Sequence, residues 1–293
     1  MKPLTLGLAH PGLMGTSIGA AARDNGARVV WASADRSQAT RMRAERAGFD
    51  DVGDLAALAR ESDVICSVCP PEAALDVANV IAAHGFDGIY LDANAIAPAT
   101  SLQVGEIVTR AGASYVDGGI IGPPPSAPGS TRLYLAGEQA ARVARLFEGT
   151  LFDARIAGNA PDAASALKMA YAAWTKGGDA LLLAIRALAA SRGIERALLE
   201  EWALSQRQAL ERSERTLSGS VPKAWRFAGE LREIAATFEA AGLPGGFHLA
   251  GAEIYARLAG FKDAFDPAPS MGDVLDTLNS GAADPRRRRG AGS

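Results

Sequence analysis

Apolar residues recur along the first half of the chain in short runs of valine, isoleucine and leucine, which alternate with stretches of helical periodicity. This alternation is typical of parallel strands joined by crossover helices. It predicts strands over 4–9, 28–32, 64–68, 89–92, 114–117 and 132–136. It also predicts helices over 17–25, 39–47, 71–83 and 99–111, which end near the glycines that helix C-termini favour, Gly26, Gly48, Gly85 and Gly112. The pattern therefore predicts a doubly wound sheet.

After Gly158 the strand pattern stops, and the remaining chain shows helical periodicity. The clearest stretch has apolar residues at alternating spacings of four and three, on one face of a long helix that ends near Gly193. This apolar stripe consists of Leu167, Tyr171, Trp174, Gly178, Leu181, Ile185 and Leu188. Further helices are predicted over 196–215, 224–241 and 246–260. The predicted fold class is α/β, with a Rossmann-type domain over 1–157, an all-helical substrate and dimerisation domain over 158–278, and a disordered basic tail over 279–293.

The composition is that of a globular protein, because 48% of the residues are hydrophobic and 22% are charged. The net charge of -3 gives no field that would attract nucleic acid or anionic lipid, and the strongest basic run, Arg286 to Arg289, lies in the tail. No stretch resembles a secretion signal or a spanning helix, so we expect a cytoplasmic protein with no nucleic-acid or membrane partner. Cys66 and Cys69 form a C-x-x-C in a strand-like run, and two cysteines cannot complete a zinc site. We expect them to fill the core, and we expect no metal.

The first predicted strand leads through His10-Pro11-Gly12-Leu13-Met14-Gly15 directly into a helix. In that context the free N–H groups and the positive dipole end of the helix bind a pyrophosphate, and Gly12 lets the backbone approach it. We therefore assign His10, Pro11, Gly12, Leu13 and Met14 to cofactor binding. His10 stands where dinucleotide-binding turns usually have their first glycine. Only G-x-x-G remains, so a purely structural turn is the alternative.

The end of the second predicted strand bears on the choice of coenzyme. A fold specific for NAD usually has Asp or Glu there, to hold the ribose 2′-hydroxyl. This chain has Ser33 instead, with Arg36 and Ser37 just beyond. A guanidinium and hydroxyl groups suit a 2′-phosphate, so we predict that Ser33 and Arg36 bind the cofactor and that NADP is preferred over NAD. The alternatives are that Arg36 is a solvated loop residue, and that the nearby Asp35 supplies the acid.

Four motifs follow one another at 10–15 (H-P-G-L-M-G), 92–98 (D-A-N-A-I-A-P), 117–123 (D-G-G-I-I-G-P) and 158–168 (G-x9-K). Together they resemble the β-hydroxyacid dehydrogenase superfamily, which includes 3-hydroxyisobutyrate and 6-phosphogluconate dehydrogenases. The segments 223–227 and 243–248 look like a poorly characterised branch whose helical domain is related to that of phosphogluconate dehydrogenase. The resemblance implies a nicotinamide cofactor that is also contacted by Val68, Cys69 and Asn94, and relatives that pair through the helical domain.

In such enzymes a lysine near the start of the interdomain helix is the general acid when a carbonyl is reduced and the base in the reverse direction, and Lys168 matches it. A donor is needed because negative charge develops on the carbonyl oxygen. We expect a desolvated cleft to lower the pKa of Lys168 below the usual value of about 10.4. Where relatives follow this lysine with asparagines, the chain has Tyr171 and Ala172. We assign Tyr171 to substrate contact, with a core role as the alternative.

Relatives use a Ser-Gly-Gly stretch to hold the substrate carboxylate, whereas this chain has Ile121-Gly122-Pro123. Ile121 lacks a hydroxyl and Pro123 lacks an N–H, so one anion-binding device is reduced to the region of Gly122. We assign Ile121, Gly122 and Pro123 to substrate contact. The substitution favours a substrate that is larger or more apolar than a short 3-hydroxy acid, and the alternative is that Ile121 is merely packed.

Charged residues of the helical half are further candidates for substrate contact. The late Lys-Asp pair of the family corresponds to Arg232-Glu233, which keeps the signs of charge and changes the reach. Arg226, Glu230 and His248 are also candidates. For each of these three, a structural salt bridge, a solvated helix face or a capped turn is the alternative.

These expectations combine into one predicted function, an NADP-dependent oxidoreductase that transfers a hydride between the nicotinamide and a hydroxyacid-like or related alcohol or carbonyl substrate. An imine reductase-like enzyme is one alternative, which the presence of Lys168 disfavours. A non-catalytic dinucleotide-binding regulatory protein is another, because His10 and Ile121 both depart from the family pattern at binding loops. We expect a small-molecule substrate and a homodimer formed through the helical domain.

Overall fold

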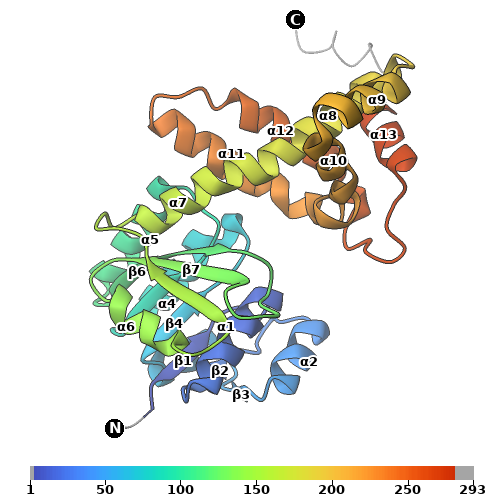
Figure 1. Cartoon of the computed structure of the whole chain (residues 1–293). Helices are drawn as coiled ribbons and strands as arrows, with labels where there is room; N and C mark the ends of the chain where they lie inside the picture. Colours follow the sequence, from blue (N-terminus) through green and yellow to red (C-terminus); the bar gives the residue numbers. More distant parts are fainter. Residues whose placement is uncertain (1–2, 281–293) are drawn as a thin grey trace, which may run out of the picture. The chain divides into compact units, whose positions relative to one another are not determined.

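A computed structural model describes residues 3–280 of the chain. The chain divides into two compact units between Ala170 and Tyr171 (Figure 1). The boundary expected near Ala157 is 13 residues before this division. The difference arises because the first turns of the long helix pack on the first unit. The basic run Arg286 to Arg289 and the rest of the predicted tail beyond Ser280 lie outside the described residues.

The first unit contains one sheet of eight strands in the order β3-β2-β1-β4-β5-β6-β7-β8. All neighbouring strands are parallel except β6 and β7, which are antiparallel. The order reverses at β1, which lies between β2 and β4, and ligands of doubly wound sheets bind at the carboxyl ends of the strands at such a point. The strands are β1 Thr5–Leu8, β2 Arg28–Trp31, β3 Asp50–Asp51, β4 Val64–Ser67, β5 Ile89–Asp92, β6 Ser114–Ile121, β7 Thr131–Ala136 and β8 Phe152–Ile156.

The six strands expected from the apolar pattern are confirmed, and the two outermost strands were not predicted. β3 is two aspartates, and β8 has a buried residue only at Phe152, so neither has an apolar run. The expectation of parallel strands is wrong for β6 and β7. The connection from Ile121 to Thr131 is too short for the crossover of a dozen or more residues that a parallel pair needs.

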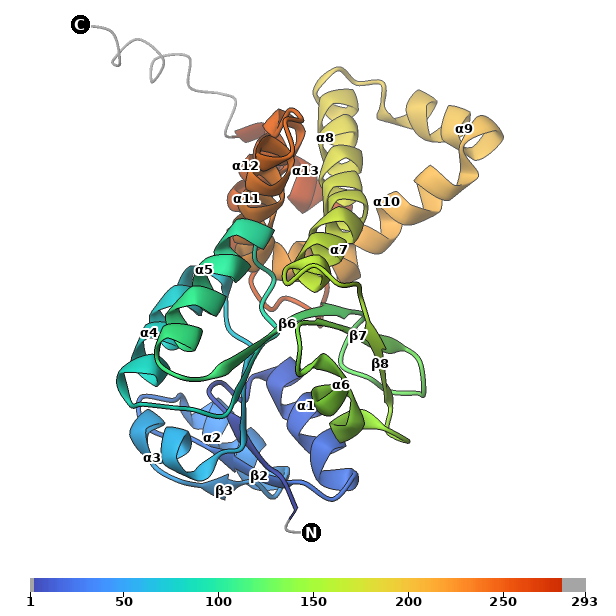
Figure 2. The same ribbon diagram turned by 90° about the vertical axis from the view of Figure 1, so that its left-hand side faces the viewer.

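Helices cover both faces of the sheet, as expected for a doubly wound fold. Figure 2 shows α4 and α5 on one side of the strands and α1 and α6 on the other. The short α3 was not predicted. The helices of this unit are α1 Leu13–Asp24, α2 Gln38–Arg46, α3 Leu55–Glu61, α4 Ala74–Ala83, α5 Pro98–Arg110 and α6 Ala140–Ala144, and α7 Ala163–Ala172 begins in it.

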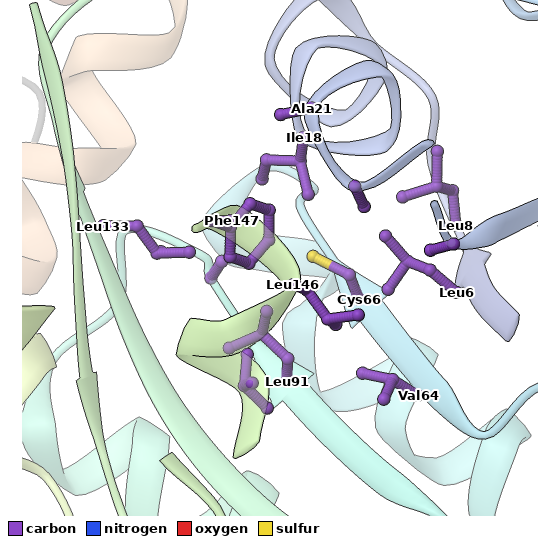
Figure 3. Packing of buried hydrophobic residues seen from close by; sticks show 14 of the residues in the cluster. Leu6, Leu8, Ile18, Ala21, Val64, Cys66, Leu91, Leu133, Leu146 and Phe147 are labelled. Carbon is purple, nitrogen blue, oxygen red and sulfur yellow. The ribbon is translucent and has the colours of Figure 1, made fainter. Parts of the chain in front are cut away.

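Two hydrophobic clusters lie on opposite faces of the sheet because side chains alternate along each strand. One cluster joins Leu6, Leu8 and Cys66 to Ile18 of α1 and to Phe147 (Figure 3). The other joins strand residues to α3, α4 and α5. The predicted core role of Cys66 is confirmed, since its thiol is free and buried and burial raises its pKa.

The second unit is helical over its described length. The long helix ends at Ser191, and Gly193 follows with a positive φ of 67°. The single helix expected over 196–215 is wrong, because the backbone of Gln206 (φ -139°, ψ 49°) separates two helices. α11 and α12 lie side by side (Figure 1). Beyond the π-helical segment Ala173–Gly177, the helices are α8 Gly178–Ser191, α9 Glu195–Ser205, α10 Arg207–Gly219, α11 Ala224–Ala240, α12 Gly246–Arg257 and α13 Met271–Ser280.

The π-helical segment is held by side chains from other helices. Wider turns leave backbone carbonyls without their usual helical donors, and such segments are frequent at functional sites. Arg212 Nη2 donates to the carbonyl oxygens of Trp174 (2.9 Å) and Thr175 (2.7 Å). Tyr255 Oη donates to the carbonyl of Lys176 at 3.1 Å. These contacts stabilise a backbone form that would otherwise be costly.

The apolar stripe of the long helix does not face the core of its own unit. Leu181 and Leu188 are each 60% exposed, and Trp174 is 70% exposed. The opposite face is the buried one, and it includes Leu183 and Arg186, whose guanidinium pairs with two glutamates. Among residues 3–280, none of the helices combines the length and the apolarity needed to cross a bilayer.

Candidate functional site

The loop between β1 and α1 has the form of a phosphate-binding turn. Gly12 is the N-cap of α1, with an extended backbone and no capping side chain. A Cβ on Gly12 would meet no atom within 4 Å, so the backbone there is open to a ligand. A Cβ on Gly15 would lie 2.3 Å from the His10 carbonyl, which explains why this position is glycine. The assigned residues 10–14 are thus brought to one uncapped helix N-terminus, which fits a pyrophosphate.

His10 is half-buried and lies in this loop. Its Nδ1 atom is buried, and it has no hydrogen-bond partner among the described residues. Burial, followed by the positive charge of Arg36, lowers the pKa of His10 to about 4. The imidazole is therefore neutral at pH 7. The residue that replaces the usual glycine adds no charge to the loop.

Arg36 is the guanidinium that lies near His10. It is half-buried, and its Nε is a second buried polar atom without a partner in the part of the chain that the structure describes. Burial lowers the pKa of Arg36, against the effect of Asp35 and Cys69, which raise it. Ser33 is buried at the end of β2. Ser33 and Arg36 thus follow the carboxyl end of β2, the strand that pairs with β1, and their contact with a coenzyme stays a prediction.

Two further groups near this loop are already used by the protein. Ser37 caps α2 by accepting a hydrogen bond from Thr40 N at 3.3 Å, so its hydroxyl has a structural task. Arg43 Nη1 donates to the carbonyl of Pro11 at 3.2 Å. Arg43 was not predicted as a site residue, because its position on α2 gives no sign that it contacts a loop 32 residues earlier.

The ends of β4 and β5 are tied together by Asn94, which is 2% exposed. Its Oδ1 accepts a hydrogen bond from Cys69 N at 2.6 Å, and its Nδ2 donates to Ser67 Oγ at 3.1 Å and to Asp92 Oδ2 at 2.9 Å. Burial raises the pKa of Asp92 to about 7 and that of Cys69 to about 12. Asn94 thereby fixes the turn that carries Val68 and Cys69, both half-buried.

The start of α7 is anchored on β6 by Asp117. Its Oδ2 accepts from Ser165 N at 2.8 Å, and its Oδ1 accepts from Ser165 Oγ at 2.5 Å. A third bond comes from Ser101 Oγ at 2.9 Å. A Cβ on Gly119 would lie 2.5 Å from the Ala164 carbonyl, so only glycine lets α7 approach the strand this closely. The Asp-Gly-Gly motif is therefore a helix-docking device.

Lys168 lies on the helix that Asp117 anchors. Its Nζ donates a hydrogen bond of 2.6 Å to the carbonyl of Ile120. Asp117 pairs with Asp92 at the end of β5, so Ile120 lies three residues, roughly 10 Å, beyond that end. β1, β4, β5 and β6 run parallel, and their carboxyl ends share one edge. Lys168 is therefore held at the same edge as the phosphate loop, and from the sequence only the family resemblance singles it out.

The segment expected to contact substrate follows directly. Ile121 is 4% exposed, so its side chain is packed in the unit. Gly122 has φ of 126°, and a Cβ there would lie 2.5 Å from the Ser130 carbonyl. Pro123 is exposed, and its carbonyl accepts from Thr131 Oγ1. Tyr171 is 45% exposed and belongs to the second unit. Substrate contact by these residues stays a prediction.

In the second unit, charged candidates form structural contacts of their own. Glu230 is buried and pairs with Lys176, which the sequence did not single out. His248 packs on Phe238 with ring centroids 4.5 Å apart, and burial lowers its pKa. Arg232 is exposed on α11.

Comparison with known proteins agrees with this geometry. Residues 5–149 match the family described as the NAD binding domain of 6-phosphogluconate dehydrogenase. The N-terminal domain belongs to this family. Farther along the chain, residues 189–258 match a second family, described as a domain of unknown function, DUF1932. The expected dinucleotide-binding fold and the expected branch of the superfamily are thereby confirmed.

Individual proteins resemble the chain over larger parts of its length than either family does. An uncharacterized 28.5 kDa protein of Methanothermus fervidus is 28% identical over 165 residues, which are 56% of this chain and 63% of that protein. The conserved protein MTH1747, of unknown function and described as similar in structure to 3-hydroxyacid dehydrogenases, is 25% identical with a TM-score of 0.65, covering 88% of this chain and 98% of its own. A 3-hydroxyisobutyrate dehydrogenase from Salmonella typhimurium shares the fold at 16% identity and a TM-score of 0.68, covering 93% and 99%.

Proposed function

We propose that the chain is an NADP-dependent oxidoreductase that transfers a hydride between the nicotinamide and a hydroxyacid-like or related alcohol or carbonyl substrate, with Lys168 as general acid and base. The observation that carries the proposal is the hydrogen bond from Lys168 Nζ to the Ile120 carbonyl. It holds an ammonium group at the sheet edge where dinucleotides bind in doubly wound folds. Membership in an NAD-binding family supports the same edge as the coenzyme site.

The proposed chemistry needs one hydride and one proton. A bound reduced nicotinamide supplies the hydride to the carbonyl carbon. Lys168 stabilises the charge that develops on the oxygen and then transfers a proton to it, and in the reverse direction the neutral amine removes that proton. The Ile120 carbonyl directs one of the three N–H bonds of the ammonium, so it fixes where the proton is delivered.

The preference for NADP is supported by Arg36. Its partnerless Nε is half of a guanidinium fork, and such a fork binds a phosphate through two parallel hydrogen bonds. We expect Arg36→Gln to raise the Kd for NADPH at least about tenfold and to change the Kd for NADH less than about threefold. Arg46→Gln, at an exposed position of α2, the helix that follows Arg36, is the matched control. Equal Kd values for NADPH and NADH in the unmodified protein would remove the preference.

The activity itself is tested with the full chain and a substrate panel. Hydroxyacids, aromatic alcohols, ketones and cyclic imines are supplied with each oxidised or reduced coenzyme, and turnover is followed by nicotinamide absorbance. Turnover of alcohols or ketones supports the proposal. Turnover of imines alone favours the imine reductase alternative, and coenzyme binding without turnover favours the regulatory one. Calorimetry that detects no binding of either coenzyme overturns the proposal.

The predicted homodimer also stays a proposal, and the exposed stripe supports it. Leu181 and Leu188 present an apolar face that a second copy of the same helix would cover, as in the self-complementary interfaces of twofold dimers. Leu181→Glu combined with Leu188→Glu should convert a dimer to a monomer in light scattering. Leu102→Glu, on an exposed position of α5, should leave the dimer intact. A monomeric unmodified protein would refute this assembly.

A further inference from the structure

Positively charged side chains gather around the start of α11 and pack on aromatic rings. Lys223 immediately precedes the helix, and Arg226 lies in its first turn. Lys223 Nζ is 5.9 Å from the centroid of the Phe265 ring, and Arg226 Cζ is 5.5 Å from that of Phe227. Aromatic faces attract cations without neutralising them. The local charge therefore remains positive.

Two more lysines extend this group. Lys176 Nζ is 4.8 Å from the centroid of Phe227, and Lys262 Nζ is 4.3 Å from that of Trp225. We call Lys176, Lys223, Arg226 and Lys262 the α11 cation cluster. Phe227 is shared by Lys176 and Arg226, so these two cations lie on one ring.

Lys176, Lys223 and Arg226 are close enough to repel one another, and Lys176 and Arg226 share the Phe227 ring. Burial lowers the pKa of Lys223, and the charges of Arg226 and Lys176 lower it further. Lys223 is half-buried, so solvent does not fully screen this repulsion. An arrangement of this kind destabilises the chain unless a negative charge is close by.

Three of the four cations have no ion-pair partner among the residues that the structure describes. Lys176 pairs with Glu230, whereas Lys223, Arg226 and Lys262 form no ion pair within residues 3–280. Asp263 is near, since its N–H donates to the Pro222 carbonyl at 3.0 Å, but it pairs with none of them. The positions of Lys223 and Arg226 also oppose the rule that acidic residues favour the first turn of a helix.

We infer that the α11 cation cluster binds a small anion through its carboxylate or phosphate group, with Lys223 and Arg226 as the principal donors. A bound anion would relieve the repulsion and would agree with the positive dipole end of the 17-residue α11. All members of the site belong to the second unit, and the site does not require a bound coenzyme. The inference therefore goes beyond the proposed function and does not depend on it.

Trp225 provides a local probe because it lies between Lys223 and Arg226 in the sequence and under Lys262. The full chain is labelled with ¹⁵N, and the indole N–H signal of Trp225 is assigned with Trp225→Phe. Inorganic phosphate and malonate are each titrated against sodium chloride at equal ionic strength. We expect a saturable shift whose Kd rises at least about tenfold in Lys223→Met and in Arg226→Gln. Arg207→Gln, an exposed residue of α10, is the control for loss of one positive charge.

A shift with phosphate alone identifies a phosphorylated ligand, and a shift with malonate alone identifies a carboxylate ligand. Equal shifts identify a site for either group. The absence of a saturable shift overturns the inference, and so does a Kd that is the same in the unmodified protein and in all three variants. Coenzyme titrations of the same samples test the proposed function separately, so failure of one leaves the other standing.

Discussion

Two lysines of the long helical segment, Lys168 in α7 and Lys176 in the π-helical segment, are held in different ways. Lys168 donates to a neutral backbone carbonyl of the strand beside it. Lys176 pairs with the carboxylate of Glu230, and the side chains of this pair are only 13% and 10% exposed. The oxygen that accepts from Lys168 Nζ belongs to a neutral carbonyl, whereas the oxygen that accepts from Lys176 Nζ belongs to a carboxylate.

The contact of Lys168 orients its Nζ group, whereas the contact of Lys176 stabilises the fold. A hydrogen bond to a carbonyl oxygen directs the Nζ group of Lys168 to a fixed position, which suits a group that must deliver a proton. A buried carboxylate holds the ammonium as a charge, and loss of either partner leaves the other uncompensated. We therefore expect Lys168 to matter for turnover and Lys176 to matter for folding. The following substitutions test that contrast.

The largest expected effect is on stability. Lys176→Met should lower the free energy of unfolding by about 3–5 kcal/mol, because the buried carboxylate of Glu230 loses the ammonium group with which it pairs. Urea denaturation at pH 7 measures this loss. Adding Glu230→Gln should recover most of it, since no buried charge then remains. A loss below about 1 kcal/mol would show that the pair is solvated and would remove the contrast.

The next effect is on turnover. Lys168→Met should lower kcat at least about a hundredfold, which is the usual size of general acid-base effects, and should leave the Kd for NADPH within about twofold. Lys168→Arg keeps a positive donor that cannot release its proton, so it should also be slow. Steady-state kinetics on a substrate from the panel provide the measurement. Full turnover in either variant would refute the catalytic role.

A smaller effect is expected from the anchor of α7. Asp117→Asn removes the negative charge of the carboxylate that accepts a hydrogen bond from Ser165 N. The start of α7 is then held less firmly, and Lys168 is misplaced. We expect kcat to fall roughly tenfold with NADPH binding unchanged, and stability to fall by about 1 kcal/mol. Ser101→Ala removes a different hydrogen bond of the same carboxylate and should preserve kcat. Equal losses of kcat in both variants would point to a general loss of structure.

The smallest effect should come from the support of Lys176. Tyr255→Phe deletes the hydrogen bond to the Lys176 carbonyl and should cost about 1 kcal/mol of unfolding free energy. Because the Lys168 site does not include Tyr255, kcat should stay unchanged. Thermal unfolding and a parallel activity assay check both statements. A large loss of kcat with unaltered stability would connect the π-helical segment to catalysis.

Features set by neighbouring residues could be predicted from the sequence. The phosphate loop follows from a strand, two glycines and a helix within a few residues, and the structure brings its parts together as expected. The end of β2 could be predicted for the same reason, because Ser33 and Arg36 are close in the sequence. Most strands and helices of the first unit were predictable from local periodicity.

Features set by distant contacts could not be predicted. Asp117 anchors a helix 48 residues later, and no local pattern reveals such a bond. Leu181 lies on a strongly apolar stripe, yet the core of the unit faces the other side of the helix, where Arg186 is buried with its glutamates. The break at Gln206 carries no glycine or proline, so the helical pattern passes through it unmarked.

Gly119 has a consequence for how this protein could diversify. A single added methyl group at that position would collide with Ala164 and push the helix that bears the proposed acid away from its strand. The loop after Ile121 is exposed, so its length and chemistry can vary at little cost. Laboratory evolution of this protein should therefore tolerate changes in its exposed loops. It should retain glycine at position 119, where any side chain would displace the helix.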